Sequence, residues 1–98
     1  MPADIVVSRR ALADFKRNWR VVARDKPAAA DRLLLALDAK IERLRRFPEM
    51  GAARDDIRPG CRCLIHASYL ILYEYRTDQA EVEIVAVIEA MRDLSNLP

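Results

Sequence analysis

The chain has 98 residues, of which 52% are apolar and 33% are charged, and its formal net charge is +2. This composition is typical of one small folded domain and argues against a disordered chain. The balanced charge does not call for a nucleic acid or a membrane as partner. No stretch approaches the ~18–20 apolar residues that span a bilayer, and no secretory signal precedes the domain. We therefore expect a cytoplasmic protein with no membrane partner.

The first quarter of the chain predicts a short edge strand followed by a helix. Residues 5–7 are apolar, and Ser8 is a residue type that caps helix N-termini. Apolar residues at spacings of three and four then form one stripe of a helix. They are Leu12, Phe15, Trp19 and Val22. The basic residues beside this stripe are interpreted as a solvated helix face.

A second, longer helix follows after a short link. Pro27 suits the first turn of a helix, and Pro48 disfavours helix in the residue before it. Because the link is short, the two helices are expected to form an antiparallel hairpin. We expect both apolar stripes to lie in the core. The second stripe consists of Leu33, Leu34, Leu37, Ile41, Leu44 and Phe47.

Residues 61–88 predict three antiparallel strands, separated by polar breaks at residues 67–68 and 77–80. Alternation gives the middle run one face with Tyr69, Ile71, Tyr73 and Tyr75, and the last run one face with Val82, Ile84, Ala86 and Ile88. The opposite faces are also apolar at their centres. The helical hairpin can cover only one face of such a sheet. We expect the C-terminal tail, through Met91, Leu94 and Leu97, to cover part of the other.

The predicted fold is therefore α+β, a single domain spanning residues 1–98. Its element order is β-α-α-β-β-β, with the helical hairpin packed on a small antiparallel sheet and a short C-terminal helical tail. Residues 49–60, which include Gly51, Pro59 and Gly60, are expected to form a loop.

The sequence offers little for a cofactor or a metal. Cys61 and Cys63 would lie about 6.5 Å apart on one strand face, at the limit of disulfide reach, so reduced, half-buried thiols are expected. Together with His66 they do not complete a tetrahedral zinc site. The chain has only two glycines and no phosphate-binding loop. We expect no cofactor and no metal.

A histidine-poor RNA-cleaving site is the one catalytic alternative, because arginine and tyrosine side chains can stabilise a phosphorane and transfer protons. Its candidate residues are Arg58, Arg62, His66, Tyr73, Tyr75 and Arg92. The competing interpretations are that His66 is a surface turn residue and that Glu83 simply pairs with an arginine.

Several short patterns, in order along nearly the whole chain, resemble the ParE branch of the RelE/ParE superfamily of type II toxin–antitoxin toxins. They are Ser8, Ala11, Asp14-Phe15 and Trp19; Ile41, Leu44, Phe47-Pro48 and Gly51; residues 54–62; Tyr69 to Tyr73; Val82 to Val87; and Arg92-Asp93-Leu94. The resemblance implies two N-terminal helices on an antiparallel sheet. It also implies a ParD-like antitoxin, with a ribbon-helix-helix DNA-binding domain, that wraps the toxin. Contact with DNA would then be indirect, through the antitoxin.

ParE-like toxins stall DNA gyrase and are not enzymes, whereas RelE-like toxins cut mRNA in the ribosome. By pattern, the RelE-type lysines fall near Cys61 and Cys63, and the central arginine falls near Leu70. Arg92 has a counterpart, but no tyrosine follows it. The resemblance therefore favours a non-enzymatic gyrase inhibitor. Two departures are Ala67-Ser68, where the family often has glycine, and Glu89-Ala90, where it often has a His-Gly pair.

Two sets of site residues follow as expectations. Antitoxin binding is assigned to the helical hairpin and an open sheet face, at Trp19, Leu33, Tyr69, Ile71 and Tyr73, the alternative being that these are core residues. Target binding is assigned to Arg58, Arg62, Met91, Arg92 and Leu94. The alternative functions are a RelE-like endonuclease and a non-toxic family member that only binds its antitoxin.

Overall fold

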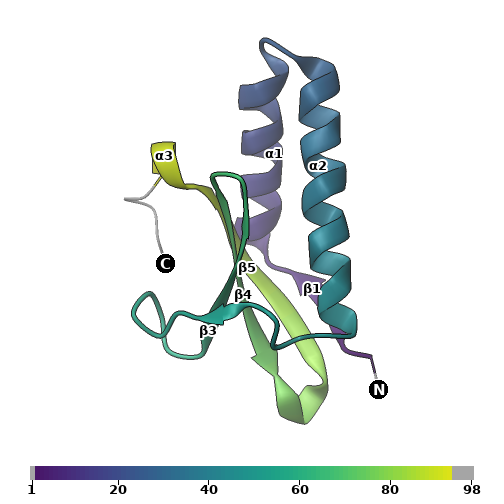
Figure 1. Cartoon of the computed structure of the whole chain (residues 1–98), viewed down its shortest axis with the longest axis vertical. Helices are drawn as coiled ribbons and strands as arrows, with labels where there is room; N and C mark the ends of the chain where they lie inside the picture. The colour runs from purple at the N-terminus through teal and green to yellow at the C-terminus, as the bar shows by residue number, and fades with distance from the viewer. Residues whose placement is uncertain (1, 94–98) are drawn as a thin grey trace.

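The computed structural model describes residues 2–93 of the chain. Along the chain the elements are β1 (Asp4–Val7), α1 (Arg9–Ala23), α2 (Pro27–Glu42), η1 (Arg43–Arg45), β2 (Ala52–Ala53), β3 (Cys61–His66), β4 (Tyr69–Arg76), η2 (Thr77–Gln79), β5 (Glu81–Glu89) and α3 (Ala90–Asp93). The strands form one sheet in the order β1-β5-β4-β3-β2. Helices α1 and α2 lie side by side as an antiparallel hairpin on one face of the sheet (Figure 1). The predicted α+β fold is confirmed.

The helical hairpin begins and ends largely as its sequence predicts. The Ser8 side chain caps α1 by accepting a hydrogen bond from the Ala11 backbone N–H at 3.0 Å, and Pro27 opens α2. The α-helical part of α2 ends at Glu42, and η1 continues it as a tighter 3-10 turn. Phe47 lies two residues beyond η1, so it no longer follows the helical stripe, and it is 60% exposed. The assignment of Phe47 to the core was therefore wrong.

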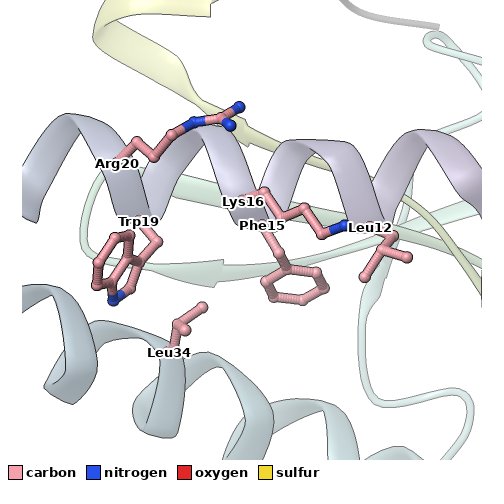
Figure 2. A pocket seen from close by; sticks show the side chains of 6 residues that line it. All are labelled: Leu12, Phe15, Lys16, Trp19, Arg20 and Leu34. Carbon is pink, nitrogen blue, oxygen red and sulfur yellow. The ribbon is translucent and has the colours of Figure 1, made fainter.

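The stripe of α1 is also only partly buried. Leu12 is 50% exposed and lies at an open groove between α1 and α2 (Figure 2). Within residues 2–93, no helix is both long and apolar enough to cross a bilayer.

The sheet is mixed rather than wholly antiparallel. β1 runs parallel to β5, with Ile5 beside Val82 and Val7 beside Ile84, whereas β2, β3, β4 and β5 pair antiparallel in turn. The edge position of β1 was predicted, but its parallel pairing and the short strand β2 were not. Both depend on contacts between distant segments, which a local apolar pattern does not encode.

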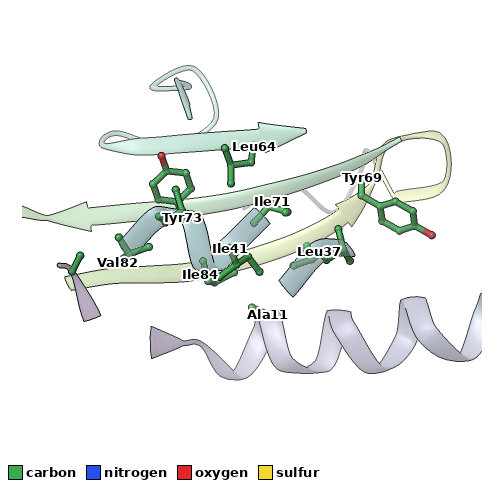
Figure 3. Packing of buried hydrophobic residues seen from close by; sticks show 12 residues of the cluster. Ala11, Leu37, Ile41, Leu64, Tyr69, Ile71, Tyr73, Val82 and Ile84 are labelled. Carbon is green, nitrogen blue, oxygen red and sulfur yellow. The ribbon is translucent and has the colours of Figure 1, made fainter. Parts of the chain in front are cut away.

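Alternation along β4 is as predicted. Tyr69, Ile71 and Tyr73 face the helices and pack in a core with Leu37 and Ile41 of α2 (Figure 3). On the other face of the sheet, Leu72 belongs to a second buried cluster.

Alternation along β5 is interrupted by a β-bulge. Leu72 lies opposite Ala86 but Tyr73 lies opposite Ile84, so Val85 has no partner on β4. The extra residue exchanges the two faces. Val87 consequently joins the core under the helices, and Ala86 and Ile88 join the second cluster. The predicted alternation was therefore wrong from Ala86 onward.

The second face of the sheet is buried at its centre. Cys61, Cys63, Leu72 and Ile88 are at most 5% exposed, and Ile57 of the loop before β3 packs against them. Both cysteines are free thiols, and burial raises the pKa of each. The expected cover by the tail is not seen for Met91, which is 88% exposed. Leu94 and Leu97 lie outside the described residues.

Candidate interaction sites

An apolar groove, here called the helix groove, lies along the outer side of the helical hairpin. Its volume is about 430 Å³. Figure 2 shows the rings of Phe15 and Trp19 pointing from α1 toward α2, where Leu34 faces them. The Trp19 indole Nε1–H donates a hydrogen bond to Asp31 Oδ1 at 2.9 Å, which fixes the ring between the two helices. The full lining is Leu12, Phe15, Lys16, Trp19, Arg20 and Leu34.

The helix groove combines apolar walls with basic groups. Lys16 and Arg20 are four residues apart on α1, so both lie on the same side of the helix, next to the apolar stripe. Within residues 2–93, no salt bridge engages either of them. Such a surface suits a partner segment with apolar side chains along one side and acidic side chains beside them.

The predicted antitoxin-binding residues are not brought together on one surface. Trp19 lines the helix groove, and Leu33 is partly buried against the core. Tyr69 is 8% exposed, and Ile71 and Tyr73 are fully buried. Their assignment to an open sheet face was wrong, because the helical hairpin covers that face. Sequence reasoning also assigned Leu12, Phe15 and Leu34 to the core alone, although their positions at the edges of the stripes are consistent with a groove.

Tyr73 anchors the loop that follows α2 and η1. Its hydroxyl donates a hydrogen bond to the Pro48 carbonyl at 2.8 Å and accepts one from the Gly51 backbone N–H at 2.9 Å. Burial raises the pKa of Tyr73, so the phenol stays neutral. The Arg62 guanidinium donates to the carbonyls of Glu49 at 3.1 Å and Gly51 at 2.8 Å. Both catalytic candidates therefore bind the backbone of this loop.

The charged residues near the start of β5 form an ion-pair network. Arg58 Nε lies 2.9 Å from Glu74 Oε2, and Arg76 Nη2 lies 2.8 Å from Glu83 Oε1. Arg76 also lies 3.5 Å from a carboxylate oxygen of each of Glu74 and Glu81. The predicted pairing of Glu83 with an arginine is confirmed. An ion-pair network of this kind holds these side chains in defined positions at this end of the sheet.

The predicted target-binding residues are spread along the sheet. Arg58 contacts Glu74, whereas Arg92 follows Glu89, which lies opposite Tyr69. The five steps along the strand from Tyr69 to Glu74 span about 17 Å. Arg62 is engaged with the loop carbonyls, and Leu94 lies outside the described residues. Met91 and Arg92 of α3 are thus the two that the structure brings together.

Two polar side chains of α1 and that of its N-cap residue, together called the α1 clamp, bind the free edge of β5. Because β1 pairs with β5 only as far as Ile84, no strand within residues 2–93 lies beside the backbone of β5 beyond that residue on this side. Ser8 Oγ donates to the Val85 carbonyl at 3.0 Å, and Asp14 Oδ2 accepts from the Val87 N–H at 2.9 Å. Asn18 Nδ2 donates to the Val87 carbonyl at 3.1 Å. The α1 clamp consists of Ser8, Asp14 and Asn18.

Asn18 also contacts the C-terminal helix, because its Oδ1 accepts a hydrogen bond from the Arg92 guanidinium. Asp14 and Asn18 are buried although both are polar. Sequence reasoning did not assign a role to either residue. The available signal was their spacing with Ala11, since residues 11, 14 and 18 share one face of a helix.

No metal-binding cluster is evident among the residues that the structure describes. Between positions 2 and 93, no group of three or more His, Cys, Asp or Glu side chains is arranged to hold a metal ion. His66 is half-buried at the end of β3, three residues before the start of β4.

Comparison with known families matches residues 5–94 to the ParE toxin of the type II toxin–antitoxin system, parDE. The chain belongs to the ParE toxin family. It is therefore a toxin-type protein of the RelE/ParE superfamily, as its sequence patterns predicted. A comparison with curated proteins gives no significant match.

Solved structures share the ParE-type fold of this chain. The chromosomal ParDE system from P. aeruginosa is 18% identical, with 89% of this chain and 95% of that chain covered and a TM-score of 0.76. The toxin–antitoxin complex RelBE2 from Mycobacterium tuberculosis is 19% identical, with coverage of 91% and 99% and a TM-score of 0.64. A mutant of E. coli toxin RelE in the free state is 18% identical, with coverage of 99% and 94% and a TM-score of 0.65.

Proposed function

We propose that this ParE-family toxin inhibits DNA gyrase without catalysing a reaction, and that a ParD-like antitoxin neutralises it in the bacterial cytoplasm. The main support for a non-enzymatic function is the burial and the neutral charge of the Cys61 and Cys63 thiols. Both lie near the positions where RelE-type toxins have lysines. Both thiols are buried, and burial raises their pKa, so they are neutral at physiological pH. A buried neutral thiol cannot supply the positive charge that a phosphorane requires.

Three of the six nuclease candidates are occupied by structural contacts. Arg62 binds the carbonyls of Glu49 and Gly51, Tyr73 binds the same loop, and Arg58 pairs with Glu74. These contacts support an inhibitor that acts by binding its target. Contact with DNA would come through the antitoxin.

The antitoxin is proposed to place an amphipathic helix in the helix groove. Its apolar residues would pack on Phe15 and Trp19, and its acidic residues would face Lys16 and Arg20. Large aromatic side chains in such grooves commonly supply most of the binding free energy.

We expect Trp19→Ala to weaken antitoxin binding by roughly 30-fold or more, as for a hot-spot residue. The matched control is Ile65→Ala, which removes a large apolar side chain that is 61% exposed on β3, away from the groove. Calorimetric titration of each purified toxin variant with the antitoxin measures the dissociation constant. If both substitutions weakened antitoxin binding equally, the helix groove would not be the binding site.

Gyrase inhibition is tested with purified gyrase and plasmid DNA, with and without ATP. Loss of supercoiling or accumulation of cleaved plasmid is expected, and addition of the antitoxin should reverse either effect. Unchanged gyrase, together with transcripts cut at defined positions in a translation reaction, would establish the RelE-like alternative. If neither activity is seen and expression does not arrest growth, the protein is a family member that only binds its antitoxin.

A further inference from the structure

The C-terminal helix α3 is short and exposed, yet its orientation is defined by specific contacts. It has one turn, Ala90–Asp93, and Met91 is 88% exposed. The Ala90 N–H donates to the Ser68 carbonyl at 2.7 Å, which ties its first residue to the β3–β4 turn. The guanidinium of Arg92 donates to Asn18 Oδ1, which ties its side chain to α1.

Asn18 can make this contact because its amide group is itself fixed. The residue is 1% exposed, and its Nδ2 donates to the Val87 carbonyl at 3.1 Å. That bond orients the amide so that Oδ1 faces away from β5 and toward Arg92. Asparagine supplies a donor and an acceptor on one planar group, which leucine, alanine or serine cannot reproduce.

We propose that Asn18 is a positioning residue for toxicity, because it fixes the Arg92 side chain and thereby the target-facing geometry of α3. The proposal rests on the proposed function in taking Met91 and Arg92 as target-facing residues. It adds a buried helix residue that does not itself touch the target. Ordering the arginine before binding reduces the conformational entropy that binding would otherwise lose.

The first test compares Asn18→Leu with Asn18→Asp. Leucine has a similar volume but cannot accept a hydrogen bond, so we expect it to reduce growth-arrest potency per folded molecule by roughly tenfold. Aspartate loses the donor to the Val87 carbonyl, but its carboxylate can form a charge-assisted pair with Arg92 that orients both groups, so we expect its potency to stay within about threefold of wild type. If Asn18 only stabilised the fold, Asn18→Asp would be more harmful than Asn18→Leu. The reason is that a buried carboxylate would face the Val87 carbonyl and lie near Asp14. Titration with antitoxin gives the folded concentration of each variant.

The second test is a double-mutant cycle with Arg92→Ala. If Asn18 acts through Arg92, Asn18→Leu should cause less than about a twofold further loss of potency in the Arg92→Ala background. The matched control is Ser8→Ala, which removes a different bond of the α1 clamp, to the Val85 carbonyl. Its effect should be the same with and without Arg92. Full additivity of Asn18→Leu and Arg92→Ala would overturn the proposal.

A third measurement does not depend on the identity of the target. NMR signals of the Arg92 guanidinium should show slower rotation in the wild type and in Asn18→Asp than in Asn18→Leu, which lacks the acceptor of this bond. Arg92 signals that do not respond to Asn18→Leu would refute the positioning role even if gyrase were inhibited. Conversely, inactivity toward gyrase would refute the proposed target and leave this result unaffected.

Discussion

At the scale of single residues, the loop after the second helix depends on Gly51. A Cβ atom at this position would lie 2.7 Å from Tyr73 Cε1 and hydroxyl oxygen, and 2.9 Å from the Cys63 carbonyl oxygen. We expect Gly51→Ala to lower the free energy of unfolding by roughly 2–4 kcal/mol, since overpacking and loss of the Tyr73 hydrogen bonds act together. Urea denaturation measures this change.

Gly60→Ala is the matched control for Gly51→Ala. Gly60 has a φ of +80°, and no atom would lie within 4 Å of its Cβ, so only backbone strain opposes the substitution. That strain should cost about 1–2 kcal/mol. If the two alanine variants were equally stable, crowding against Tyr73 would not be the reason for glycine at position 51.

Burial of Cys61, Cys63 and Tyr73 predicts how stability responds to alkaline pH. Desolvation raises the pKa of both thiols above the ordinary value of 9.0, and that of the phenol above 10.0. Because the folded pKa values are raised, the stabilisation is fully present below the ordinary values and is lost as pH rises through the folded ones. We expect the free energy of unfolding, measured in urea with a reductant, to fall progressively above about pH 9. Tyr73→Phe should remove the part of this loss that the phenol causes, and a flat profile would contradict the prediction.

At the scale of elements, the α1 clamp holds the part of β5 that has no strand neighbour. Asp14→Ala would leave the buried Val87 N–H without its acceptor and should lower the free energy of unfolding by about 1–3 kcal/mol. Asp14→Asn keeps an acceptor oxygen of the same shape and should cost clearly less. Thermal unfolding of both variants provides the comparison. Similar losses would mean that the carboxylate charge beside Arg10 and Arg17, rather than the bond to Val87, stabilises this region.

The same elements show which structural features the sequence could predict and why it could not predict the others. Helix caps, Pro27 and the alternation of β4 are local signals, and each was interpreted correctly from neighbouring residues. The bulge at Val85 is not local, because it depends on how β5 pairs with β4. The roles of Asp14 and Asn18 depend on the place where β1 stops pairing with β5. The exposure expected for Ile71 and Tyr73 was wrong, because it depends on which sheet face the helices cover.

At the scale of the whole molecule, one helix connects two surfaces with different proposed partners. One side of α1 lines the helix groove through Phe15 and Trp19, and another side holds Arg92 through Asn18. Helix α3 lies beyond the end of β5, apart from α2, which forms the other wall of the groove (Figure 1). Neutralisation and toxicity should therefore be separable by substitution.

We expect Trp19→Ala to arrest growth as strongly as the wild type but to escape neutralisation by coexpressed antitoxin.

We expect Arg92→Ala to reduce growth arrest by roughly tenfold or more while keeping its affinity for the antitoxin. The reason is that this substitution removes the proposed charge-assisted contact with the target, which lies outside the groove. Growth curves with and without antitoxin, and copurification of each pair, measure the two properties independently. If either substitution abolished both properties in a folded protein, the groove and α3 would belong to a single shared surface. Neutralisation would then be direct masking of the target-binding residues. Loss of one property in each variant would instead mean that the antitoxin controls the toxin from the other side of α1.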